Sequence, residues 1–66
     1  MGNTPDDQLK AMLFGMLCEC MDAARLLGKA YSAVDIPENR EYLRRQVTEA
    51  REHIKAAQLI MREVIS

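Results

Sequence analysis

The stretch that decides the fold is Leu9–Val34, which reads LKAMLFGMLCECMDAARLLGKAYSAV. Its apolar residues recur at alternating steps of four and three, which is the spacing of one face of an α-helix. The row consists of Leu9, Leu13, Met16, Cys20, Ala23, Leu27, Ala30 and Val34. The pattern therefore predicts one long amphipathic helix.

The apolar face of this predicted helix is wider than one neighbouring helix can cover. Further apolar residues extend it to an arc of roughly 200°, whereas packing on one neighbour needs only ~100°. They are Met12, Leu26 and Ala33 on one side of the row, and Leu17, Ala24, Tyr31, Phe14 and Met21 on the other. We therefore expect this helix to have two or more neighbours.

The residues TPDD at 4–7 are typical of a helix start. They supply a capping threonine, a proline suited to the first helical position, and two acids that favour the positive end of the helix dipole. The periodicity then predicts a helix over 5–32. Gly28 can instead end the helix early, but Tyr31 and Val34 keep the apolar phase and favour the longer helix.

A break over 33–37 separates this helix from a second one. Pro37 lacks an N–H and clashes with the carbonyl four residues back, so a straight continuous helix is excluded. Asp35 and Glu38 offer a capping box for the second helix; alternatively, the cap falls on Ile36. A connection this short makes the two helices antiparallel neighbours.

The second helix is predicted over 37–65. Its apolar residues repeat the same spacing in a narrower stripe: Leu43, Val47, Ala50, Ile54, Ala57, Met61 and Val64. Its last two turns are apolar nearly all round, which is typical of a contact surface. The sequence therefore predicts an all-α fold, a single domain over 1–66 that forms an antiparallel two-helix hairpin.

A chain of 66 residues has little core of its own, because a domain this small buries only about 60% of its unfolded surface. Two cysteines and one histidine argue against stabilisation by disulfides or a metal ion. We expect pairing into a four-helix bundle, as a homodimer or with a heteromeric protein partner. The expected interface residues are Leu9, Met12, Leu13, Phe14, Met16, Leu17, Met21, Leu59, Ile60 and Ile65.

The candidate chemical groups predict no catalytic site, metal site or cofactor. Cys18 and Cys20 are two residues apart on a helix, so their thiols point ~200° apart and cannot hold one ion. We expect Cys20 in the core and Cys18 on the polar side. His53 is expected to pair with Glu49, one turn earlier. Because no phosphate-binding loop or nucleophile motif occurs, we do not expect an enzyme.

The net charge of −1 gives no general attraction to nucleic acid or to an acidic membrane. No apolar run approaches the ~18–20 residues of a membrane span. The acids near the start are unlike a secretory signal. We therefore expect a cytoplasmic location, no membrane contact, and a protein as the partner in place of a nucleic acid.

The second helix nevertheless carries a basic flank. Its basic residues are Arg44, Arg51, Lys55 and Arg62. Three interpretations remain open. The flank is a solvated face with pairs such as Glu41–Arg45 and Arg45–Glu49, it matches charges on a neighbouring helix, or it binds phosphates across a dimer.

The second half carries an acidic, proline-containing turn, EYLRRQ at 41–46, Glu49-Ala50, Ile54 and LIM at 59–61. The segment from Asp35 to Val64, which is less than half of the chain, resembles the small two-helix co-chaperones of type III secretion systems. The resemblance implies a hairpin of this length and a heteromeric chaperone role. The hairpin plan alone is also similar to that of plasmid copy-control RNA-binding proteins of the Rop type.

Together these features predict a non-enzymatic protein–protein interaction module, such as a small scaffold, regulator or chaperone. It would bury apolar helical faces in a homodimer or against a partner helix. The alternative is a Rop-like hairpin dimer that binds nucleic acid through the basic flank of the second helix.

Overall fold

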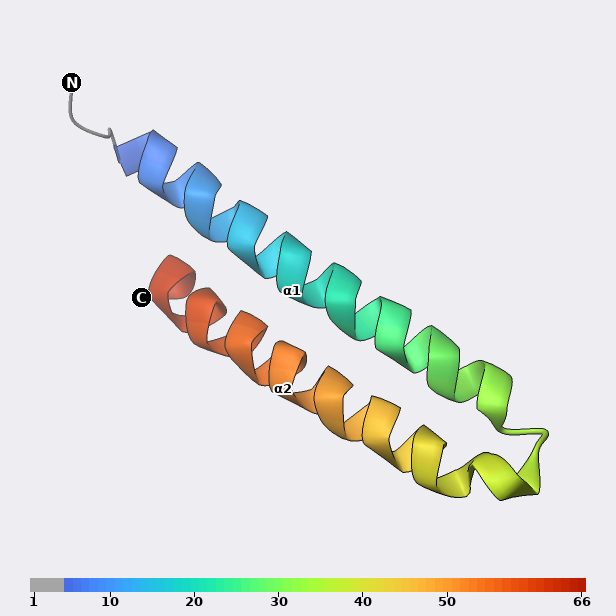
Figure 1. Cartoon of the computed structure of the whole chain (residues 1–66). Helices are drawn as coiled ribbons and strands as arrows, with labels where there is room; N and C mark the ends of the chain where they lie inside the picture. Colours follow the sequence, from blue (N-terminus) through green and yellow to red (C-terminus); the bar gives the residue numbers. More distant parts are fainter. Residues whose placement is uncertain (1–4) are drawn as a thin grey trace.

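The computed structural model describes residues 5–66 as two antiparallel helices joined by a short turn (Figure 1). Helix α1 spans Pro5–Ala33, the 3₁₀ helix η1 spans Pro37–Asn39, and helix α2 spans Arg40–Ile65. No strand occurs among these residues, so the predicted all-α hairpin is confirmed. None of the described helices is both long and apolar enough to cross a lipid bilayer.

Helix α1 runs through Gly28 and ends at Ala33, one residue beyond the predicted end. No described glycine has a positive φ, so Gly28 does not act as a left-handed helix cap. Of the two alternatives for the first helix, the longer one, which continues past Gly28, is therefore observed. The predicted cap at Thr4 lies outside the described residues.

The turn between the helices is set by Pro37. The residue before it, Ile36, has φ −116° and ψ 102°, the extended conformation that a following proline favours. The N–H of Ile36 donates to the carbonyl of Ala33 at 3.2 Å, and the Ile36 carbonyl accepts from the N–H of Asn39 at 3.0 Å. These bonds hold a compact reversal of the chain.

Two predictions about this turn are wrong. Asp35 and Glu38 form no capping box, because the N-cap of η1 is Ile36 and no side chain caps it. The other predicted position of the cap, Ile36, is the one observed. The second α-helix begins at Arg40 instead of residue 37, because Pro37 opens a single 3₁₀ turn that redirects the chain first.

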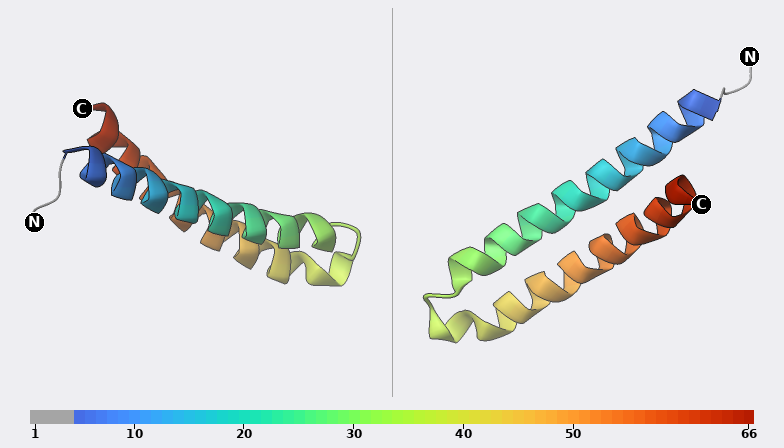
Figure 2. Two further views of the ribbon diagram at one scale, coloured as in Figure 1. Left: turned by 90° about the horizontal axis from the view of Figure 1, so that it is seen from above. Right: turned by 180° about the vertical axis from the view of Figure 1, so that it is seen from behind.

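The hairpin is long and thin. Its extents are 54 × 19 × 14 Å, and α1 and α2 stay side by side along their length (Figure 2). The Cα radius of gyration is 15.7 Å, whereas a compact domain of this length would have about 11 Å. In Figure 1 the first turn of α1 projects past the end of α2. Most residues therefore have only one neighbouring helix.

Small residues build the contact between the helices, which we call the seam. Its buried apolar residues are Ala23, Leu26, Ala30 and Ala33 on α1, and Ala50 and Ala57 on α2. Gln46 is also buried, at 9% exposure. No large side chain among residues 5–66 is fully buried. Alanines let the two backbones approach closely, but they remove little apolar area from water.

The seam is not centred on the predicted apolar stripes. The buried and half-buried rows are Met12, Met16, Glu19, Ala23, Leu26, Ala30 and Ala33 on α1, and Leu43, Gln46, Ala50, His53, Ala57, Ile60 and Val64 on α2. At 100° per residue, both helices are rotated by about 50° from their stripes. The rotation brings alanines to the closest approach.

The rotation leaves five of the eight residues of the predicted α1 stripe exposed, and three of the seven on α2. The exposed residues of the stripes are Leu9, Leu13, Cys20, Leu27 and Val34 on α1, and Val47, Ile54 and Met61 on α2. The prediction of Cys20 as a core residue is therefore wrong. Cys20 is exposed and Cys18 is half-buried, which reverses the expected order, and both thiols are free.

Candidate protein interface

Contacts across the seam fix the register of the two helices. Nδ1 of His53 lies 3.0 Å from Oε2 of Glu19, and a Cβ built on Gly15 would lie 3.4 Å from Cδ1 of Ile60. Because the helices are antiparallel, each step toward the C-terminus on α1 matches one toward the N-terminus on α2. These two contacts therefore determine which residues of α1 and α2 lie opposite each other along the whole hairpin.

This register brings the exposed stripe residues together on one side of the hairpin. In an antiparallel pair, equivalent positions flanking the seam lie on the same side. Three levels follow, with Leu13 beside Met61, Cys20 beside Ile54, and Leu27 beside Val47. We call these six residues the apolar ladder. Its five larger apolar side chains are between 41% and 47% exposed, although each borders the seam.

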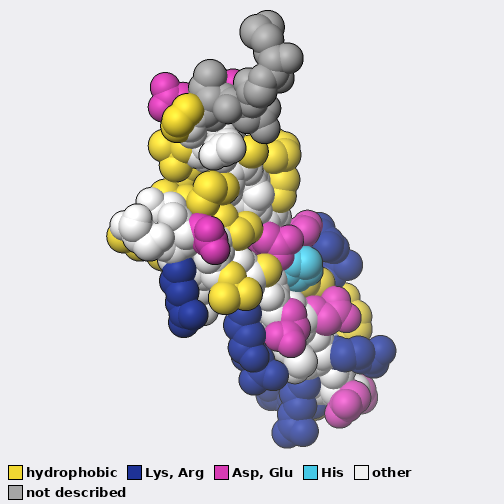
Figure 3. All heavy atoms as spheres, turned by 90° about the vertical axis from the view of Figure 1, so that its left-hand side faces the viewer, with side chains coloured by type: hydrophobic (Ala, Val, Ile, Leu, Met, Phe, Trp, Pro, Cys, Tyr) yellow, Lys and Arg dark blue, Asp and Glu magenta, His cyan; other side chains and the backbone are white. Residues whose placement is uncertain are grey.

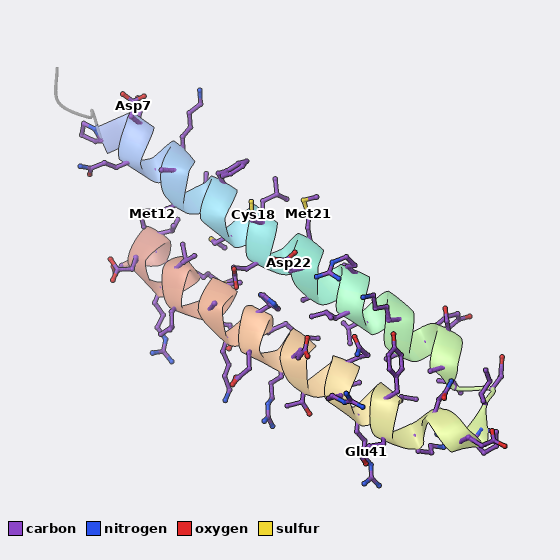
Figure 4. All side chains as sticks on the ribbon, viewed as in Figure 1. Asp7, Met12, Cys18, Met21, Asp22 and Glu41 are labelled. Carbon is purple, nitrogen blue, oxygen red and sulfur yellow. The ribbon has the colours of Figure 1, made fainter. Side chains whose placement is uncertain are left out.

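Apolar surface continues from the ladder around α1. Phe14, Leu17, Met21 and Tyr31 are all more than half exposed, and in Figure 4 Met21 points away from α2. We call these four residues the outer face of α1. On α2 the ladder is bordered instead by Arg44, Arg51 and Gln58. The two edges of the ladder therefore differ in character, apolar on α1 and basic on α2.

The ten predicted interface residues divide into two groups. Seven are exposed: Leu9, Leu13, Phe14, Leu17, Met21, Leu59 and Ile65. Three are half-buried on the side that faces the other helix, namely Met12, Met16 and Ile60. Figure 4 shows Met12 pointing toward α2. The hairpin itself therefore covers part of the predicted interface.

Sequence reasoning missed five of the six ladder residues because it placed them in the contact between the two helices. They are Cys20, Leu27, Val47, Ile54 and Met61. The polar residues Glu19, Gln46 and His53 were the available signal. They lie on rows next to the stripes and occupy the seam. The rows that contain these polar residues also contain the buried alanines, whose small side chains let the two helices pack closely.

The four residues of the predicted basic flank, Arg44, Arg51, Lys55 and Arg62, are all exposed on α2. Nζ of Lys55 lies 3.7 Å from Oε2 of Glu52. The single-helix ion pairs that the structure gives for residues 5–66 are this one and Asp22–Arg25 at 3.9 Å. The pairs expected at Glu41–Arg45 and Arg45–Glu49 are not among them.

A polar cluster lies on the side of the seam opposite the ladder. His53 contacts Glu19 at 3.0 Å and Oδ2 of Asp22 at 3.9 Å, so the predicted pairing with Glu49 is wrong. The three side chains are between 29% and 45% exposed. Figure 3 shows acidic side chains around the histidine.

No pocket is found among residues 5–66. Comparison of the chain with family models, with curated proteins and with solved structures finds no match.

Proposed function

We propose that this chain is a non-enzymatic protein–protein interaction module that pairs with a second copy of itself to form a four-helix bundle. The observation that carries the proposal is the apolar ladder. It extends from Leu13 to Leu27, about 21 Å along α1. Burying one such side chain contributes about 1.5–3 kcal/mol, and α1 and α2 leave several of them half in water.

The surface area of the chain supports the same proposal. The chain exposes 5378 Å². A compact monomer of its mass, 7.5 kDa, would expose about 4,200 Å². The excess of about 1,200 Å² is larger than the ~800 Å² that each partner buries in a typical stable interface. An interface of typical size on the ladder side would remove most of it.

The character of the two ladder edges favours a particular pairing. If α1 faced α2 of the second copy, the outer face of α1 would meet Arg44 and Arg51. If α1 faces α1 of the second copy, the apolar edges meet each other, α2 faces α2 along the edge with Arg44, Arg51 and Gln58, and each pair of helices runs antiparallel. A two-fold axis through the middle level of the ladder generates this arrangement. It places Cys20 opposite Cys20 of the second copy.

A different protein is the other occupant that the sequence suggests, since the second half resembles heteromeric co-chaperones. We favour the second copy because one pairing of two hairpins buries two ladders against each other, with apolar surface supplied by both copies. The hypothesis of a heteromeric partner remains an outcome of the experiment below.

Sedimentation equilibrium and thermal unfolding of the full chain over a concentration series test this proposal. We expect a discrete dimer and a Tm that rises with protein concentration, because association and stability are linked. A discrete monomer with a concentration-independent Tm would contradict it. Aggregates that become soluble only on co-expression with another protein would instead indicate a heteromeric partner.

The second candidate function is nucleic-acid binding by the basic flank. Its support is that Arg44, Arg51, Lys55 and Arg62 are all exposed on one helix. Acids intersperse this surface, and Lys55 already pairs with Glu52. We therefore expect no gel shift of RNA or duplex DNA at about 50 mM salt. A shift that disappears in the Arg44→Glu/Arg51→Glu variant would establish this candidate.

A further inference from the structure

Glu19, Asp22 and His53 bring three potential metal ligands together from two helices. Glu19 and Asp22 are one turn apart on α1 and face the same way. His53 reaches them from α2, with Nδ1 3.0 Å from Oε2 of Glu19 and 3.9 Å from Oδ2 of Asp22. One ligand atom from each residue lies within 4.8 Å of the others. We infer that this cluster binds a divalent transition-metal ion that bridges α1 and α2.

The distances from His53 to the two carboxylates fit an ion with small side-chain adjustments. Zinc binds nitrogen and oxygen at about 2.1 Å, so two neighbouring ligands lie about 3.0 Å apart at a right angle and about 3.4 Å apart in a tetrahedron. The His53–Glu19 distance of 3.0 Å is already in this range. The His53–Asp22 distance of 3.9 Å exceeds it by about half an ångström. A half-exposed aspartate closes that gap by rotating its side chain.

The ligand types select the class of ion. One imidazole nitrogen and two carboxylate oxygens suit zinc and related first-row ions, whereas Ca²⁺ and Mg²⁺ prefer oxygen alone. Nη2 of Arg25 is 3.9 Å from Oδ1 of Asp22, whereas His53 faces the other carboxylate oxygen, Oδ2. A cation between the carboxylates offsets their mutual repulsion. Partial exposure leaves room for water at the remaining positions.

The position of the cluster in the fold gives the ion a structural consequence. Glu19 and His53 occupy seam positions where helical hairpins usually place apolar residues. The ion would take the place of the proton between Nδ1 of His53 and Glu19, and the neutral ring would then carry its proton on Nε2. A bound ion ties the two helices together near the middle of the hairpin. The site faces away from the ladder, so it is accessible whether or not two hairpins pair.

Calorimetric titration of zinc chloride into the full reduced chain, together with thermal unfolding followed by circular dichroism, tests this inference. We expect saturable binding of about one ion per chain and a higher Tm in zinc. Glu19→Gln and Asp22→Asn should each weaken binding about tenfold or more, because each removes a ligand. Asp22→Asn keeps the side-chain shape and leaves the His53–Glu19 contact in place, so it decides the test if other variants fold poorly.

Two controls separate this site from other zinc ligands. Glu41→Gln changes an exposed acid on α2 about 18 Å along the helix from His53, and it should bind zinc as the parent chain does. The Cys18→Ser/Cys20→Ser variant should also bind normally. No saturable binding by the parent chain, equal binding by Asp22→Asn, or loss of binding on removing the thiols would each overturn the inference.

Discussion

His53 and Glu19 are 34 residues apart in the sequence, yet Nδ1 of His53 lies 3.0 Å from Oε2 of Glu19 across the seam. Both are half-buried on faces that pack against the other helix. A polar pair at such positions fixes the register of two helices and lowers their stability relative to an apolar pair.

This pair gives a prediction for stability in the absence of metal ions. His53→Leu alone or Glu19→Leu alone leaves the remaining group without its hydrogen bond, so each should lower the free energy of unfolding by about 0.5–1.5 kcal/mol. The double variant should be at least as stable as the parent chain, because it replaces both partners. Urea unfolding with a chelator present measures all four proteins. A double variant that is less stable than the parent chain would contradict this account.

The apolar ladder gives a prediction for self-association. Leu27→Glu places a charge in the ladder, where Leu27 is 42% exposed, and should weaken the dimer at least about tenfold. Lys29→Glu is the control, because Lys29 is exposed on the opposite side of the hairpin. Sedimentation equilibrium compares the two dissociation constants. Equal effects would mean that the ladder is not the contact surface.

The free thiols report the arrangement of the two hairpins. In the proposed bundle Cys20 lies on the two-fold axis and faces its own copy, whereas Cys18 is two residues away and points elsewhere. With only Cys20 present, in Cys18→Ser, mild oxidation should give a covalent dimer on a non-reducing gel. With only Cys18 present, in Cys20→Ser, it should give much less. Equal yields would exclude the α1–α1 pairing.

The two helical glycines predict stability gains of different size from one substitution. A Cβ on Gly28 would meet no atom within 4 Å. Gly28→Ala should therefore raise the free energy of unfolding by about 0.5–1 kcal/mol, through helix propensity alone. Gly15→Ala should gain less, because its methyl would press on Cδ1 of Ile60 at 3.4 Å. Thermal unfolding at one protein concentration separates the two, and an equal gain would argue against this packing.

Much of the fold follows from local signals in the sequence. The unbroken phase of apolar residues predicts that α1 passes Gly28, and Pro37 predicts the place of the turn. Both depend on backbone chemistry within a few residues. The rotation of the helices does not follow in the same way, because hydrophobicity favours the row of Leu13 and Leu27, whereas close packing favours alanine. That choice depends on both helices at once.

The polar cluster of Glu19, Asp22 and His53 could not be predicted from the sequence for a related reason. A single helix offers His53 the neighbour Glu49, which is one turn away. The actual neighbours, Glu19 and Asp22, depend on the register of α1 against α2. A slip of one turn would separate them. The cluster can therefore be predicted only when the register of α1 against α2 is known.

The alanine seam has a consequence for the connecting turn. Alanine methyl groups bury little apolar area. Two separate peptides with the sequences of α1 and α2 would therefore bind each other weakly. The short covalent linker between Ala33 and Pro37 keeps the two helices together, at an effective concentration of about millimolar. A protease that nicks the chain at Val34–Ile36 would thus release both halves, although it touches none of the seam residues on α2.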